Sequence, residues 1–355
     1  MKNETSNPSA GRRSVIKWLG AAAGASVCAP FVQTARAADP LFVNTWGGDW
    51  EKAAAAHLFE PFTKESGIPI RTVSPVSYAK LAAQARTGVY EFDVTTLGGG
   101  ELIRAVEAGL VEKIDTSIID MKQLPPGQAY LSGIATHAFA TVIASRKDKF
   151  ANGGPQNWAE FWDTQRFPGP RSLQRYAARV VPLALLADGV PTNKVYPMDL
   201  DRAFKSFDRL KKDVRVWWTQ GQQSQQLLRD GEVNAIAIWH GRALSLIRQN
   251  VPVDLVWNQG EIDRAYWVVA KGTPRAKQAW QFIASALKAE RLAKFCMQAD
   301  YSPVDQRVFQ YIPEAQAKGM PTYPANYRLT FEQDLAKMGP QLNELSRRFD
   351  QFVVR

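Results

Sequence analysis

The amino-acid sequence has very little cysteine and histidine, with two cysteines and three histidines in 355 residues. Cys28 lies in an N-terminal stretch with the composition of a cleaved export signal, so the exported chain would keep only Cys296 and form no internal disulfide. A chain of this length can bury enough apolar surface to fold without one. Because His57, His137 and His240 are far apart in the sequence, we expect neither a metal site nor a cofactor.

Blocks of basic residues are also lacking, although the formal net charge is +10. The first 38 residues hold five Lys or Arg and one Glu, so the remainder carries ten minus four, or +6. No stretch combines basic with aromatic residues in the manner of a nucleic-acid-binding segment. We interpret the surplus as a solvated basic surface and expect no nucleic-acid partner.

Residues 1–38 are predicted to be a twin-arginine signal peptide that is cleaved after export. Arg12 and Arg13 precede a mildly apolar run rich in Ala and Gly, and small residues just before position 39 offer a cleavage site. The run is too short for a stable membrane anchor. Lipidation at Cys28 is not favoured, because Val27 stands where Gly or Ala is expected. The sequence therefore predicts a periplasmic protein.

The body of the chain alternates between strand and helix patterns, which predicts an open α/β sheet. A β-α-β unit covers residues 41–73, and a strand at 92–97 runs into three glycines and a helix at 101–108. The glycine run is neither GxGxxG nor a P-loop, so we interpret it as a tight turn lining a ligand cleft. The chain crosses between two halves near residues 140 and 268, which indicates two lobes that close over a ligand.

Residues 216–242 carry the clearest site pattern. One strand ends in Trp217 and Trp218, and a second, at 235–238, delivers Trp239 and Arg242 onto the following loop. Open α/β sheets bind ligands at such strand ends. No nucleophile with its base lies there, so the pattern favours binding over catalysis.

A second cationic pair lies upstream, in a helix predicted to run from residue 173 to 187. Arg175 and Arg179 are four residues apart and would share a helix face, with Tyr176 beside them. Two ordinary surface arginines are the alternative interpretation.

The chain resembles a known family: the spermidine/putrescine-binding type of periplasmic substrate-binding proteins, which serve ABC importers. The resemblance spans the predicted mature chain. It rests on Trp46-Gly47-Gly48, Phe92-Asp93-Val94, residues 108–115, 157–162 and 230–233, Trp239-His240-Gly241-Arg242, residues 271–274 and residues 301–305.

The resemblance implies a two-lobed α/β fold of the type II periplasmic-binding class, with two open sheets flanked by helices, a hinge and a ligand cleft. Lobe 1 would comprise residues 39–140 plus 268–325, and lobe 2 residues 141–267 plus 326–355. It also implies a monomer that is not an enzyme and that delivers a small solute to the permease subunits of an ABC importer.

The family's polyamine site combines aromatic walls with carboxylates, because a dication favours both. Trp46, Trp218 and Trp239 stand at the matching aromatic positions, but Arg179 and Ala265 stand at or near acidic ones. Arginines would repel a dication and bind a carboxylate. We therefore expect a carboxylate-bearing solute such as a γ-aminobutyrate-like zwitterion, with Asp263 or Glu261 receiving its ammonium group.

The candidate site is defined by ten residues that the pattern and the resemblance place at the cleft, with no catalytic residue among them. These are Trp46, Gly47, Gly99, Arg175, Tyr176, Arg179, Trp218, Trp239, Arg242 and Asp263. One alternative is a putrescine- or spermidine-binding protein proper. Another is a periplasmic hydrolase around His240, which no G-x-S-x-G motif accompanies. A third is a partner that presents a ligand to a chemoreceptor.

Overall fold

The computed structural model describes residues 39–354, so the predicted signal peptide lies outside the described part of the chain. Its strands form one mixed sheet of 11 strands whose main path runs β2-β1-β3-β9-β5-β8-β6-β7. The strands are β1 (Leu41–Asn44), β2 (Ile70–Val73), β3 (Val94–Leu97), β4 (Ala129–Tyr130), β5 (Gly133–Arg146), β6 (Arg171–Gln174), β7 (Val214–Trp218), β8 (Ala235–Trp239), β9 (Val253–Val269), β10 (Ser302–Pro303) and β11 (Phe331–Glu332).

Helices surround this sheet, and none in residues 39–354 is long and apolar enough to cross a membrane. They are α1 (Gly48–Ala54), α2 (Glu60–Ser66), α3 (Tyr78–Thr87), α4 (Gly99–Glu107), α5 (Trp158–Trp162), α6 (Ala177–Ala187), α7 (Leu200–Leu210), α8 (Gly221–Arg229), α9 (His240–Arg248), α10 (Ala276–Ala286), α11 (Ala289–Ala299), α12 (Glu314–Ala317), α13 (Pro324–Tyr327), α14 (Leu335–Met338) and α15 (Leu342–Val354). A π-helical turn, Ala55–Phe59, joins α1 to α2.

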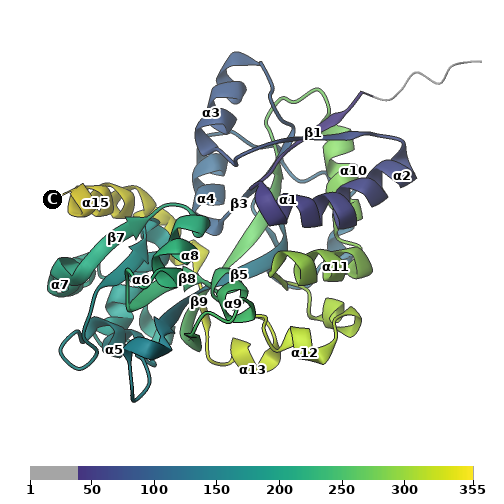
Figure 1. Ribbon diagram of the computed structural model, residues 1–355. Helices are drawn as coiled ribbons and strands as arrows, with labels where there is room; N and C mark the ends of the chain where they lie inside the picture. The colour runs from purple at the N-terminus through teal and green to yellow at the C-terminus, as the bar shows by residue number, and fades with distance from the viewer. Residues whose placement is uncertain (1–38, 355) are drawn as a thin grey trace, which may run out of the picture. The chain divides into compact units, whose positions relative to one another are not determined.

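Strands β5 and β9 connect the two halves of the sheet. They have 14 and 17 residues and pair antiparallel, with register shifts between Ala135 and His137 and between Thr141 and Ile143. β9 pairs on its other side with β3, and β5 pairs with β8. The two expected open sheets are therefore hydrogen-bonded into one path, which Figure 1 shows crossing from the α1 and α11 side to the α5–α8 side.

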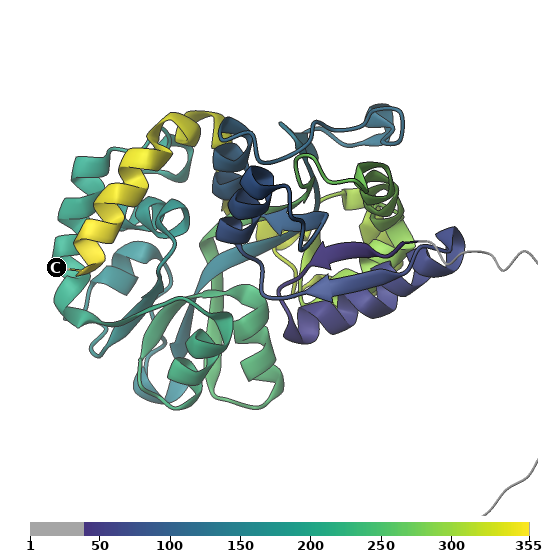
Figure 2. The ribbon, with the colours of Figure 1, turned by 90° about the horizontal axis from the view of Figure 1, so that it is seen from above.

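Each half has its own aromatic core. On the β1 side, Trp50 of α1 packs against Trp267 of β9 and Phe295 of α11, with ring centroids 5.8 and 5.5 Å apart. On the β7 side, Trp217 packs edge-on against Phe349 of α15 at 5.4 Å. Helix α15 lies beside the teal helices in both views (Figures 1 and 2) and contacts α6. The C-terminal helix is therefore part of the second core.

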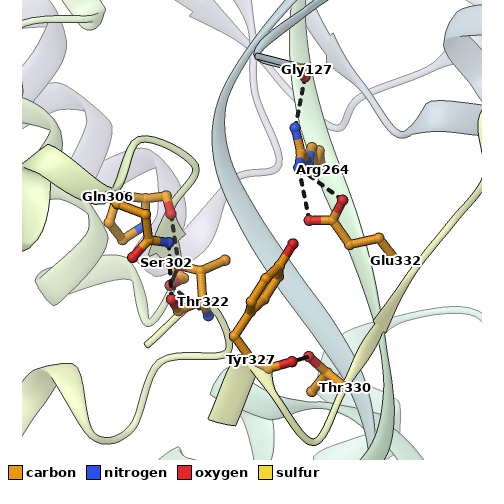
Figure 3. A network of polar contacts seen from close by, with 9 residues as sticks. Gly127, Arg264, Ser302, Gln306, Thr322, Tyr327, Thr330 and Glu332 are labelled. Carbon is orange, nitrogen blue, oxygen red and sulfur yellow. Dashed lines mark hydrogen bonds and ion pairs between the residues drawn. The ribbon is translucent and has the colours of Figure 1, made fainter. Parts of the chain in front are cut away.

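Strand β11 is held against the long strand β9 by polar contacts of Arg264 (Figure 3). Arg264 of β9 donates 2.8 Å hydrogen bonds to both carboxylate oxygens of Glu332 and a 2.7 Å bond to the carbonyl of Gly127. Both bonds to Glu332 come from Nη2 of Arg264, and this charge-assisted contact stabilises β11 in its parallel register with β9.

Helix α4 begins at Gly99, in contact with Leu335 of α14. A Cβ atom added to Gly99 would lie 2.4 Å from Cδ2 of Leu335, so only glycine fits there without displacement. The sequence predicted this glycine as a ligand contact, but its Cα faces an apolar side chain of the C-terminal segment.

We expect Gly99→Ala to destabilise the protein by ~1–3 kcal/mol, because it overpacks the contact with Leu335. Urea denaturation of the mature protein measures this. The Gly99→Ala/Leu335→Ala double variant should be more stable than the sum of the two single effects, because the smaller side chain admits the methyl group. Strict additivity would contradict the steric explanation.

Candidate functional site

A cavity of about 540 Å³ lies where the ends of β1, β3 and β8 meet the first turns of α1, α8 and α9. Six of the ten predicted site residues line it: Trp46, Gly47, Tyr176, Arg179, Trp239 and Arg242. Its volume lies in the range usual for small-molecule sites. The structure thus brings together residues that are almost 200 positions apart in the sequence.

Aromatic rings form much of the cavity wall. Trp239 lies 5.8 Å from Phe139 and 6.1 Å from Tyr176, measured between ring centroids. Trp46 is 44% exposed, and its Nε1 donates a 2.9 Å hydrogen bond to Oγ1 of Thr96, which holds the ring over the cavity. These faces can enclose an aliphatic chain or a cationic group.

Trp218 is not part of this wall. It is fully buried and stands behind Trp239, with ring centroids 5.1 Å apart and an interplanar angle of 85°. Its Nε1 donates to the carbonyl of Ala237 at 2.9 Å. Because Trp218 points into the core at the last residue of β7, it supports the wall from behind and does not line the cavity.

Arg242 is the cation that the cavity leaves without an acidic partner. It lies in the first turn of α9, and its Nη1 donates only a 3.3 Å hydrogen bond to Oε1 of Gln225. In the described part of the chain, the other cations lining the cavity are each paired with a carboxylate: Lys52 with Asp49, Arg179 with Asp263, and Arg248 with Asp300. The cavity therefore has one uncompensated positive charge.

Arg179 lines the cavity but is already paired. It is 7% exposed, and its Nε and Nη2 lie 2.8 and 2.7 Å from Oδ2 of Asp263. The other oxygen of Asp263 accepts a 3.1 Å hydrogen bond from the backbone N–H of Gly99. Asp263 is 3% exposed and does not line the cavity, so in this geometry its carboxylate faces Arg179 and the backbone of Gly99, and its role as the partner of a ligand ammonium group stays a prediction.

Arg175 also lies outside the cavity. The sequence predicted one helix from residue 173, but β6 runs to Gln174 and α6 begins only at Ala177. Arg175 therefore precedes the helix and does not share a helical face with Arg179. Its Nη2 lies 3.7 Å from Oδ1 of Asp350 in α15, on a different surface.

Several cavity residues were not anticipated as ligand contacts. His137 and His240 are both buried, and burial lowers their pKa values to about 3, so both rings are neutral at ordinary pH. Nδ1 of His240 accepts a 3.2 Å hydrogen bond from the N–H of Ala140, which places its proton on Nε2. Arg248 and Asp300 join α9 to the end of α11 at the cavity. Neither histidine has a local sequence signal, since His137 lies within the apolar strand β5 and His240 directly follows the apolar strand β8.

Glu261 lies deeper, in the centre of β9. It is fully buried, its Oε1 accepts a hydrogen bond from Gln333, and its Oε2 has no partner among the described residues. Burial, together with the negative charge of Asp263, raises the pKa of Glu261 to about 8. The side chain therefore favours its protonated form at neutral pH and cannot serve as a free carboxylate for a ligand amine.

Among residues 39–354, the cavity combines aromatic walls with one guanidinium that has no acidic partner, and its size suits a small solute. The chain matches the family model described as bacterial extracellular solute-binding protein over residues 57–324, and it belongs to this family. Its members are extracellular or periplasmic substrate-binding proteins of transport systems and not enzymes.

Three relatives illustrate the family. The chain is 32% identical to the γ-aminobutyric acid-binding protein of Pseudomonas aeruginosa, over 89% of this chain and 91% of that protein. It is 26% identical to the spermidine/putrescine-binding periplasmic protein of Escherichia coli, over 64% of this chain and 66% of that protein. The solved Atu4243 GABA receptor superposes with a TM-score of 0.81 at 32% identity, covering 88% and 97% of the chains, which confirms the two-lobed periplasmic-binding fold.

The pH dependence of stability follows from Glu261. The folded protein holds this proton up to a pH of about 8, whereas the unfolded chain releases it near 4.5, so the free energy of unfolding should fall as pH rises through this window. We expect Glu261→Gln to remove that loss. The difference in free energy of unfolding between the variant and the wild type should shift in favour of the variant by more than about 1 kcal/mol from pH 5 to pH 8.

Thermal unfolding of both proteins between pH 5 and pH 8 measures the difference. His137 and His240, whose folded pKa values are about 3, contribute stability that rises with pH up to about 6.5. This contribution is the same in both proteins, so it cancels when their unfolding free energies are compared. Parallel pH profiles would show that Glu261 is ionised in the folded state.

Proposed function

We propose that this protein is the periplasmic solute-binding component of an ABC importer and that it captures a small carboxylate-bearing solute, with a γ-aminobutyrate-like zwitterion favoured. The observation that carries the proposal is Arg242, the cavity cation without an acidic partner in the described residues. The captured solute is then delivered to the permease subunits in the inner membrane.

A carboxylate suits the position of Arg242 for two reasons. The guanidinium fork donates two parallel hydrogen bonds to a carboxylate. Arg242 also lies in the first turn of the nine-residue helix α9, where the helix dipole favours negative charge. The aromatic faces of Trp239 and Tyr176 then enclose the aliphatic part of the solute, and an ammonium group can rest against such a face.

A polyamine is the weaker candidate for this cavity. Ala265, which the resemblance places near an acidic position of the polyamine-binding proteins, lines the cavity with a methyl group. The lining carboxylates Asp49 and Asp300 are each engaged by a cation. A dication would therefore meet net positive charge.

The mode of capture follows from the two long strands. We propose that residues 39–140 plus 268–325 and residues 141–267 plus 326–355 act as lobes that close over the solute by flexing β5 and β9. Residues 1–38 direct export through the twin-arginine route, and the mature protein acts as a monomer.

We expect Arg242→Gln to weaken binding of the carboxylate solute by roughly tenfold to a thousandfold, because a charge-assisted hydrogen bond contributes about 1.5–3 kcal/mol. Isothermal titration of the mature protein with γ-aminobutyrate measures this. Arg175→Gln is the matched control, since it removes the same group outside the cavity and should leave the affinity unchanged.

The ligand class is tested by thermal shift with γ-aminobutyrate, other amino acids, organic acids, putrescine and spermidine. Stabilisation by carboxylate-bearing compounds supports the proposal. Stabilisation by the polyamines alone would overturn it.

A further inference from the structure

We propose that Arg179 is the charge selector of the cavity: its guanidinium masks a cluster of three carboxyl groups, those of buried Asp263 and Glu261 and of partly exposed Glu101, whose negative charge would otherwise make the cavity an amine site. This inference rests on the proposed function, because it explains why the cavity takes a carboxylate and not a diamine.

The cluster places three carboxyl groups around one cation. Nη2 of Arg179 lies 2.7 Å from Oδ2 of Asp263 and 4.0 Å from Oε2 of Glu101. Glu261 is two positions from Asp263 along β9, so both side chains lie on the same face of the strand. Burial lowers the pKa of Arg179, but these three carboxyl groups outweigh that effect and raise it above the ordinary value.

The guanidinium stands between the cluster and the cavity. Arg179 lines the cavity, whereas Asp263 and Glu261 are 3% and 0% exposed and do not line it. Gly98, which also lines the cavity, completes the enclosure. A Cβ at Gly98 would lie 2.6 Å from Nη2 of Arg179, 2.6 Å from Oε2 of Glu101 and 2.8 Å from Oδ2 of Asp263. Any larger residue there would push the ion pair apart.

Aromatic rings flank the same guanidinium on the cavity side. The Cζ atom of Arg179 lies 4.9 Å from the ring centroid of Phe139 and 5.1 Å from that of Tyr176, and both rings line the cavity. A cation is therefore already held between two aromatic faces and a carboxylate. This is the environment that an alkylammonium ligand requires, and here a side chain of the protein occupies it.

Removing the guanidinium should therefore invert the preference of the cavity at this end. Arg179→Gln leaves the carboxylates of Asp263 and Glu101 next to two aromatic faces, where an ammonium group of putrescine can take the vacated place. Asp263→Asn has the opposite effect, because it leaves Arg179 without its closest partner and adds a second cation to Arg242. That variant should favour glutarate, which replaces the ammonium group of γ-aminobutyrate with a carboxylate.

The test is titration of four mature proteins with γ-aminobutyrate, putrescine and glutarate: wild type, Arg179→Gln, Asp263→Asn and the Arg179→Gln/Asp263→Asn double variant. We expect Arg179→Gln to gain at least about tenfold in affinity for putrescine relative to glutarate, which has no ammonium group to take the vacated place. Asp263→Asn should gain at least about tenfold for glutarate relative to γ-aminobutyrate. The double variant, in which both charges are absent, should retain the wild-type order of preference.

Melting curves with and without each compound separate ligand preference from folding. If Arg179→Gln is unstable alone, putrescine should raise its melting temperature, and Asp263→Asn tests the same inference through the opposite charge. Unchanged preference in both single variants overturns the inference. Failure of the wild type to bind any carboxylate compound would instead overturn the proposed function.

Discussion

The antiparallel pairing of β5 with β9 is the interaction on which the rest of the structure depends. These strands carry the hydrogen bonds that join the β1–β3 half to the β6–β8 half, and each supplies residues to the site. β5 presents His137 and Phe139 to the cavity, and β9 presents Ala265. Asp263 and Glu261 lie in the same central stretch of β9, so the groups that set the charge of the site are positioned by the strands that hold the halves together.

The cavity balances charge over a short distance. Three of the four Lys and Arg side chains that line it are paired with carboxylates, which leaves Arg242 as the cation without an acidic partner within residues 39–354. Such pairing is costly to break once it is buried, because removing one partner leaves the other without compensation. Because its ion pairs resist being broken, the cavity selects a ligand by charge as well as by shape.

Much of the fold follows from local pattern. The strand at residues 94–97, the amphipathic helix α7 and the β8-to-α9 junction with Trp239 and Arg242 all have the periodicity and the turn residues that their structures require. The two lobes were predicted from the chain crossings near residues 140 and 268 and from the family resemblance. Hydrogen bonding between the halves through β5 and β9 is a long-range pairing, which no local pattern encodes.

The site was harder to predict, because a side chain's partners decide its role. From the sequence, Arg175 and Arg179 are equally good candidates for a ligand-binding arginine. The start of α6 at Ala177 distinguishes them, because it places Arg179 in the cavity wall and Arg175 outside it. Asp263 carries the negative charge that a ligand ammonium group needs, and it lies in a part of the chain that the sequence places at the cleft. Its contact with Arg179, 84 positions away, removes it from the cavity.

The packing of α15 has a consequence for biosynthesis. Phe349 and Phe352 belong to the same core as Phe207 and Trp217, so that core stays open until residues 342–354 have left the ribosome. Strand β9, which completes the centre of the sheet, is also made after most of the chain. That core is therefore completed only after α15 has been synthesised, and until then its apolar side chains are exposed to aggregation.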